Sequence, residues 1–82
     1  MNKIGVVEHF YSKISVAVVA LSADLSVGDK IHFKGATTDF TQAVKSMQIE
    51  HESISTAKNG QKIGLKVDNQ VRPNDEVFLA DD

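Results

Sequence analysis

The stretch Lys62-Ile63-Gly64-Leu65-Lys66-Val67 decides the fold class of this chain. Its three apolar side chains alternate with two lysines and a glycine, so that one side of an extended segment is apolar and the other side is polar. This period of two is typical of a β-strand with one buried face. Residues 30–34 repeat the pattern, with Ile31 and Phe33 on the apolar side. No stretch sustains a helical period, and the sequence therefore predicts an all-β fold.

Four further segments have the apolar, β-branched composition of strands, and turn signals separate them. The strands expected besides 30–34 and 62–67 are 4–11, 14–21, 41–50 and 76–79. Within 41–50 the apolar phase changes between Val44 and Met47, which predicts a bulge or a bend. Ser53 can cap one short helical turn within 53–58. Six strands favour closure of the sheet on itself, because closure removes its edges, and we expect a small closed six-stranded β-barrel.

The length of 82 residues predicts a single domain that spans residues 1–82. The chain has no cysteine, so neither a disulfide nor a cysteine-ligated metal can stabilise it. Its longest apolar stretch, 14–21, is far shorter than the roughly 20 residues of a membrane-spanning helix. No apolar run of signal-peptide length follows Lys3. We therefore expect a cytoplasmic protein without a membrane partner.

The charged residues are unevenly distributed along the chain, whose net charge is −2. Residues 30–66 hold six lysines against three acids, a local sum of +3, whereas the remaining residues sum to −5. The acidic total argues against a surface that is basic throughout. Two interpretations stay open for the lysines: a solvated surface of mixed charge, or a basic face that binds phosphates. The outward lysines that would form such a face are Lys30, Lys34, Lys62 and Lys66.

No motif of a catalytic or cofactor site occurs in the chain. Both glycine-rich phosphate-binding motifs are absent, and no serine lies in a Gly-x-Ser-x-Gly elbow. Glu50-His51-Glu52 is the one compact set of metal-ligating residue types, but on a strand His51 points away from the two glutamates. We therefore expect no catalytic residue, no metal and no nucleotide or other cofactor.

The segment Val44-Lys45-Ser46-Met47-Gln48-Ile49-Glu50-His51-Glu52, followed by Ala57, Gly60 and 63–67, resembles the second barrel domain of translational GTPases. This is domain II of elongation factor Tu and of its archaeal and eukaryotic counterpart. The turn at 27–31 matches the same family, 5–8 is similar to its opening strand, and 72–77 lies where the family has a turn before its closing strand. The resemblance therefore covers nearly the whole chain. It implies a closed translation-factor β-barrel. A translational GTPase needs a nucleotide domain ahead of this one, and the chain opens at its own methionine, so the resemblance implies a stand-alone module that does not hydrolyse GTP.

In that family the domain helps to hold the aminoacyl end of transfer RNA. The alignment places the pocket positions of the family on Gln48, His51 and Lys62, of which His51 keeps a residue type of the family. The resemblance therefore implies a polar patch formed by these three residues. Similar barrels also occur as C-terminal appendages of a collagenase-like peptidase family linked to RNA modification, which is a second precedent.

Two functions remain open on these grounds. The first is a non-catalytic module that binds RNA, either transfer RNA or a ribosomal site, and whose binding weakens with salt because phosphate contacts release counterions. The lysines expected to carry it are Lys30, Lys34, Lys62 and Lys66. The alternative is a protein-interaction module that docks in trans on a partner domain, or self-associates, through an apolar patch.

Overall fold

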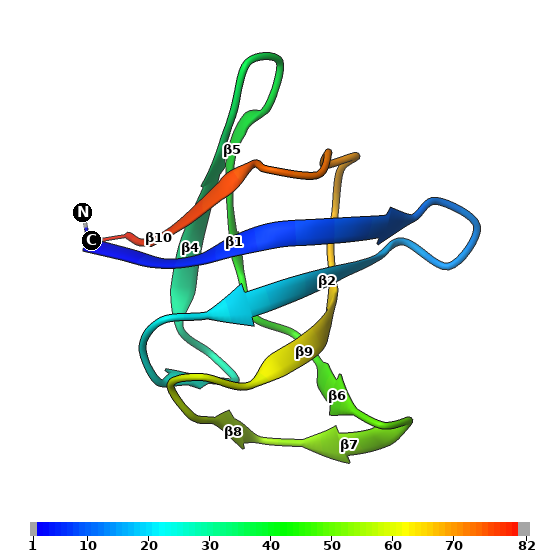
Figure 1. Ribbon diagram of the computed structural model, residues 1–82, viewed down its shortest axis with the longest axis vertical. Coiled ribbons are helices and arrows are strands. Elements are labelled where there is room, and N and C mark those ends of the chain that lie inside the picture. Colours follow the sequence, from blue (N-terminus) through cyan, green and yellow to red (C-terminus); the bar gives the residue numbers. More distant parts are fainter. Residues whose placement is uncertain (1, 81–82) are drawn as a thin grey trace.

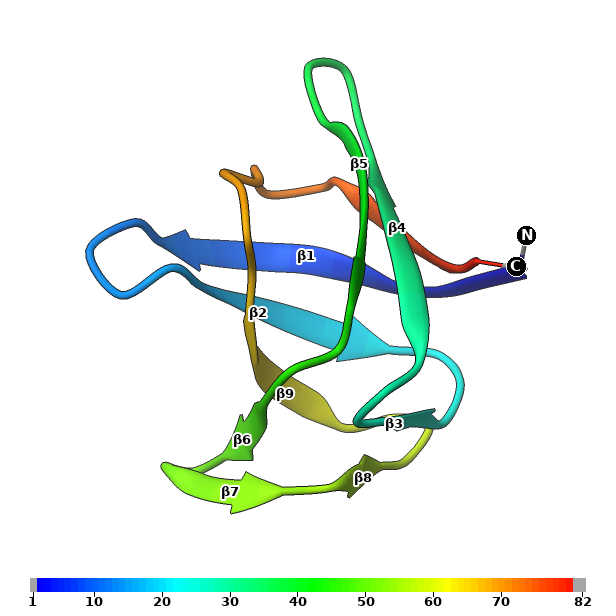
Figure 2. The ribbon, with the colours of Figure 1, turned by 180° about the vertical axis from the view of Figure 1, so that it is seen from behind.

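The computed structural model describes residues 2–80, and the all-β prediction is confirmed (Figure 1 and Figure 2). No helix within these residues is long and apolar enough to cross a membrane. The strands are β1 (Asn2–Tyr11), β2 (Val16–Leu21), β3 (Leu25–Ser26), β4 (Lys30–Lys34), β5 (Asp39–Ala43), β6 (Met47–Ile49), β7 (Glu52–Ile54), β8 (Thr56–Ala57), β9 (Lys62–Lys66) and β10 (Glu76–Leu79).

Eight strands form one antiparallel sheet in the order β5-β4-β10-β1-β2-β9-β6-β7, and β3 pairs with β8 in a second sheet. The large sheet curls so far that β5 crosses the opposite side of the core from β1 and β2 (Figure 2). It is a half-barrel, and the prediction of a closed six-stranded barrel is wrong. Within the described residues β5 and β7 are the two edges and no ladder joins them. The cause is the chain after Ala43, which leaves the ladder before β5 acquires a second neighbour.

The core consists of the inward-facing residues of these strands. Ile31 and Phe33 of β4, like Ile63 and Leu65 of β9, are at most 1% exposed, which confirms the alternation read from both segments. Phe33 also stacks on Phe40, with ring centroids 5.1 Å apart. The other buried apolar residues are Ile4, Val7, Ala17, Val19, Leu21, Leu25, Val44, Met47, Ala57, Val67, Val71 and Val77.

The bend expected between Val44 and Met47 is present, because β5 ends at Ala43 and β6 begins at Met47. Both residues are buried in the core, although on a regular strand they would point to opposite faces. Backbone hydrogen bonds fix the bend against the turn before β4: Val44 N donates to Asp29 O at 2.8 Å, and Gly28 N donates to Val44 O at 2.9 Å. The bend lets one segment of chain serve two parts of the curled sheet.

The helical turn expected within 53–58 is wrong. These residues form part of β7 and the whole of β8. In the second sheet Ala57 pairs with Leu25, and both side chains are buried. An isolated helical turn is unfavourable because nucleation fixes several residues for one hydrogen bond. Pairing as β8 instead buries Ala57 against β3, which stabilises the extended conformation.

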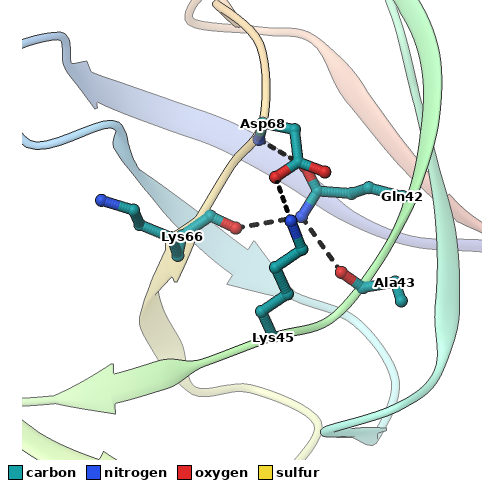
Figure 3. A network of polar contacts seen from close by, with 5 residues as sticks. All are labelled: Gln42, Ala43, Lys45, Lys66 and Asp68. Carbon is teal, nitrogen blue, oxygen red and sulfur yellow. Dashed lines mark hydrogen bonds and ion pairs between the residues drawn. The ribbon is translucent and has the colours of Figure 1, made fainter.

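One side chain, that of Gln42 on β5, bridges the open side of the half-barrel (Figure 3). Its buried amide donates from Nε2 to Lys66 O at 3.0 Å and to Ala43 O at 3.2 Å. Its Oε1 accepts a hydrogen bond from Asp68 N at 2.7 Å, and Lys45 Nζ lies 2.7 Å from the Asp68 carboxylate. Hydrogen bonds of one amide therefore join β5 to the chain leaving β9, where a closed barrel would have a strand ladder.

The two ends of β1 lie in different surroundings. At its start Asn2 pairs with Leu79 of β10, so both ends of the described chain meet there. At its other end Tyr11 leads into the β1–β2 hairpin, which projects from the sheet (Figure 1).

Candidate functional site

A groove of about 640 Å³ lies on the outer face of the sheet, between the β1–β2 hairpin and the β6–β7 hairpin. Both hairpins project toward the same side of the molecule (Figure 1). The volume of the groove falls within the roughly 300–1,000 Å³ typical of ligand sites. The residues that line it are Tyr11, Ile14, Val16, Val18, Ser46, Gln48, Glu50, His51, Gly64 and Lys66.

The floor of the groove is made by outward-facing positions of β2 and β9. Val18 pairs with Gly64, and Gly64 pairs on its other side with Gln48 of β6. A Cβ atom at Gly64 would lie 3.3 Å from Val16 Cγ1 and 3.8 Å from Gln48 O, so a side chain there would occupy the groove. Glycine in the interior of a strand often marks a place where another molecule approaches closely. Here it leaves a hollow with valines on one side.

The β1–β2 hairpin supplies an apolar wall. Tyr11 and Ile14 are 50% and 57% exposed, and within the described part of the chain no large apolar side chain is more exposed. The turn brings the two together, with Ile14 N donating to Tyr11 O at 3.3 Å and Ser15 at a φ of 54°. The Tyr11 ring also packs edge-on against His9, with centroids 4.4 Å apart. Adjacent exposed apolar side chains beside a hollow are typical of a contact surface.

The turn between β6 and β7 forms the opposite wall. Its central residues, Glu50 and His51, have φ angles of 51° and 68°, as in a type I′ turn. Such turns favour Asn-Gly, and a non-glycine residue in this conformation costs on the order of 1–3 kcal/mol. Because Glu50 and His51 occupy this turn in spite of that cost, we infer that their side chains have a role at the groove. The strand expected to run on to Glu50 is wrong, because β6 ends at Ile49 and His51 occupies the turn.

Two lysines beside the groove have no acidic partner within residues 2–80. Lys66 Nζ donates to Ile14 O at 2.8 Å, and Lys13 lines a smaller hollow on the hairpin. An ammonium group has three donors, so Lys66 retains donors for a ligand. Four other lysines form ion pairs with acids: Lys3 with Glu76, Lys45 with Asp68, Lys58 with Asp24 and Lys62 with Glu8.

The structure brings together three of the six binding residues expected from the sequence. Gln48, His51 and Lys66 all line the groove. Lys62 shares the outer face of β9 but does not line the groove, and its Nζ lies 3.3 Å from Glu8 Oε1. The polar patch implied by the alignment is thus only partly assembled.

The basic face expected from four outward lysines is not formed. Lys30 and Lys34 lie on β4, whereas Lys62 and Lys66 lie on β9. Strands β10, β1 and β2 separate β4 from β9 in the sheet. Because the sheet curls, the two pairs of lysines point to different sides of the molecule, and no single phosphate backbone tract would contact all four at once.

The sequence prediction missed the apolar part of the groove, namely Tyr11, Ile14, Val16, Val18 and Gly64. The apolar residues of 14–21 were interpreted as core residues, because the sequence does not show that only one face of this strand is covered by the rest of the protein. One signal was present. A glycine in the middle of the strand at 62–67 contributes nothing to packing and points to a close approach.

The described residues hold no group of three or more His, Cys, Asp or Glu side chains that could bind a metal. His32 has both an acidic and a hydroxyl neighbour: its Nε2 lies 2.5 Å from Asp39 Oδ1, and Thr41 Oγ1 lies 3.2 Å from its Nδ1. This order of groups resembles a hydrolase triad. However, the Asp39 side chain is 66% exposed, and the trio lies on β4 and β5, away from the groove. We interpret it as a cross-strand polar cluster.

No protein-family model matches the chain. The chain is 45% identical over 78 residues to an uncharacterized protease of Methanocaldococcus jannaschii, a match that covers 94% of this chain and 19% of that protein. It is 32% identical over 74 residues to a collagenase of Porphyromonas gingivalis, covering 88% of this chain and 20% of the collagenase. The chain therefore spans about a fifth of the length of these curated relatives.

Two crystal structures share the fold. Both contain the C-terminal domain of a Geobacillus thermoleovorans protein named as a U32 peptidase. One has a TM-score of 0.90 at 21% identity and covers 95% of this chain and 99% of that chain. The other has a TM-score of 0.89 at the same identity and covers 95% of this chain and 91% of that chain.

The assignment to domain II of the elongation factors is wrong, and so is the RNA-binding role in translation drawn from it. The relatives that match nearly the whole chain are named as proteases and collagenases. The elongation-factor motifs misled because 27–29 and 44–52 form a turn and a bend of the fold, and a shared fold does not imply a shared function. The chain is similar in sequence to one part of proteases and collagenases, and in fold to the C-terminal domain of a U32 peptidase.

Proposed function

We propose that this chain is a non-catalytic β-domain of the U32 peptidase type, which acts by contacting the catalytic domain of such a peptidase. One observation carries the proposal: the 45% identity over 94% of this chain is to only 19% of a protein named as a protease. The other four-fifths of that relative have room for a catalytic domain. The part that matches this chain is then an accessory to it.

The chemistry of the described residues supports a non-catalytic role. A hydrolase needs a nucleophile, a base that contacts it and donors for the developing oxyanion, gathered in a site that excludes water. The groove holds Ser46 and His51, but within residues 2–80 no side-chain hydrogen bond joins the two or orients either one. No buried side-chain polar atom among residues 2–80 lacks a hydrogen-bond partner, so no unsatisfied group points to a missing substrate in the core.

The surface supports a binding role. Exposed Tyr11 and Ile14 stand beside a preformed hollow whose floor is apolar. Covering apolar surface stabilises a complex by roughly 25 cal/mol per Å² removed from water, before the costs of association are subtracted. A contact of this kind needs a shaped surface rather than reactive groups.

The test uses the purified chain and a U32-type catalytic chain that lacks its own β-domain. Sedimentation velocity should show a one-to-one complex of the two, and the chain alone should not hydrolyse gelatin or a fluorogenic peptide. A β-barrel protein of similar size and charge serves as the control and should not bind. Absence of a complex would refute the docking role. Hydrolysis by the chain alone, lost in His32→Ala, would refute the non-catalytic role.

A further inference from the structure

We propose, resting on the function above, that the groove receives an extended segment of the catalytic domain about four residues long. One apolar side chain of the segment lies over Gly64, and an acidic side chain beside it contacts Lys66. This assigns both the surface of the contact and the chemistry of the partner segment.

The dimensions of the groove indicate an extended segment. From Tyr11 on β1 to Gln48 on β6 the groove crosses β2 and β9, which makes three steps between neighbouring strands. Neighbouring strands lie about 4.8 Å apart, so the span is roughly 14 Å. An extended chain advances about 3.3 Å per residue and covers that distance in about four residues.

The position over Gly64 selects an apolar side chain. Val16 and Val18 of β2 lie on one side of Gly64, and the exposed rings and branches of Tyr11 and Ile14 rise beside them. A polar group placed there would lose water without gaining a hydrogen bond, which is unfavourable. The other side of Gly64 offers Gln48, whose amide can bond the backbone of the segment.

The charges orient the segment. Lys66 reaches the β1–β2 hairpin through its bond to Ile14 O, and Lys13 lies on that same hairpin. Neither lysine has an acidic partner among the described residues, whereas Lys62 on the same strand as Lys66 is already paired with Glu8. The hairpin side of the groove is therefore positive, and Glu50 makes the opposite wall negative. An acid on the hairpin side and a neutral or basic residue near Glu50 complement this pattern.

A second copy of this chain is the other occupant to consider. In a symmetric dimer the contact is reciprocal, so a residue on one side of the groove meets the opposite side of the groove in the other copy. To fill the hollow over Gly64, a folded second copy would have to insert a projecting segment between the two hairpins. The oligomeric state of the wild type therefore distinguishes this occupant from a segment of the catalytic chain.

The experiment compares variants of this chain in binding to the catalytic chain that lacks its own β-domain. Gly64→Val fills the hollow and Lys66→Glu reverses the charge beside it, and each should weaken binding about tenfold or more. Lys34→Glu is the matched control, because it makes the same charge change at an exposed lysine on β4 and should leave binding unchanged. A benzophenone amino acid at position 48 should cross-link to an acidic–apolar segment of the catalytic chain, and one at position 34 should not.

The outcomes separate the two proposals. If wild type binds and Gly64→Val and Lys66→Glu bind equally well, the groove is not the contact, while the proposed function stands. If wild type does not bind, the proposed function fails and the groove assignment fails with it. If wild type instead self-associates and Lys66→Glu abolishes this, the occupant is a second copy and the assignment is overturned. Thermal unfolding checks the fold of each variant, and Lys66→Glu carries the test if Gly64→Val does not fold.

Discussion

Strands β4 and β9 have almost the same sequence pattern but different outer surfaces. Each has lysines at both ends and two large apolar residues facing the core, and each alternates exposed, buried, half-buried, buried and exposed positions. They differ at the centre of the outer face, where β4 has His32 and β9 has Gly64. The two strands therefore contribute equally to the fold while differing in what they offer a ligand.

The central residue decides whether the outer face is filled or hollow. On β4 the His32 ring is held by Asp39 and Thr41 of the neighbouring strand, and together they cover that face. On β9 nothing projects from Gly64, and the space above it is the groove. The alternation of residues specifies the fold, and a single outward position specifies the site.

The largest expected effect tests whether the inner faces of the two strands are equivalent. Phe33→Ala should lower the free energy of unfolding by about 3–5 kcal/mol and Leu65→Ala by about 2–5 kcal/mol, because both side chains are fully buried. Urea denaturation followed by circular dichroism measures both. A loss below about 1 kcal/mol for either would mean that its strand is not part of one common core.

The next effect concerns the Gln42 side-chain amide, which joins β5 to the chain leaving β9. Gln42→Ala should lower the free energy of unfolding by about 1–3 kcal/mol, because it removes the partner of two part-buried backbone groups, Asp68 N and Lys66 O. Gln48→Ala is the matched control, since Gln48 is exposed, and it should change stability by less than about 0.5 kcal/mol. Equal effects of the two substitutions would show that the half-barrel does not depend on the bridge.

Substitutions at the central residues of the two strands, His32 and Gly64, should show which of them contributes to stability and which to binding. His32→Gly should cost about 1 kcal/mol, because it removes two hydrogen bonds and places a glycine inside a strand. Gly64→Val should change stability by less than about 1 kcal/mol, since valine favours strands while Val16 must shift slightly. Thermal unfolding measures both. A large loss in Gly64→Val would mean that the hollow is a packing requirement rather than a site.

The smallest expected effect is that of the ion pair between Lys62 and Glu8. A double-mutant cycle with Lys62→Met and Glu8→Gln should give a coupling of about 0.2–1 kcal/mol that shrinks as salt is added, because both groups are exposed. A coupling well above this range, or one insensitive to salt, would show that the pair is more shielded from solvent than the two exposed side chains indicate.

The sequence predicted the elements whose local signals agree with their packing. The strands at 30–34 and 62–67 follow from alternation, and the bend near Val44 follows from a change of phase. Closure could not be predicted in the same way. Whether β5 meets another strand depends on where the chain after Ala43 travels, and the bridge through Gln42 depends on Lys66 and Asp68, which are more than twenty residues away.

Three of the ten residues that line the groove were predicted as binding residues. Gln48, His51 and Lys66 stood out as polar residues at outward positions, although they were assigned to an RNA contact that the relatives contradict. Tyr11 and Ile14 were not identified, because exposure at a hairpin tip is a property of the folded surface. The local sequence of 50–51 also gives no sign of a type I′ turn, since Glu-His lacks the residues that such turns favour.

The position of the chain ends has a consequence for any longer polypeptide that contains this sequence. Asn2 and Leu79 lie together at one end of β1, and Tyr11 lies at the other end. Nine steps of about 3.3 Å place the groove roughly 30 Å away from that junction. A tether that starts there must cover this distance before a segment attached to it can enter the groove. Tether length thus sets the effective concentration of the segment, and a short tether favours exchange between molecules over closure within one.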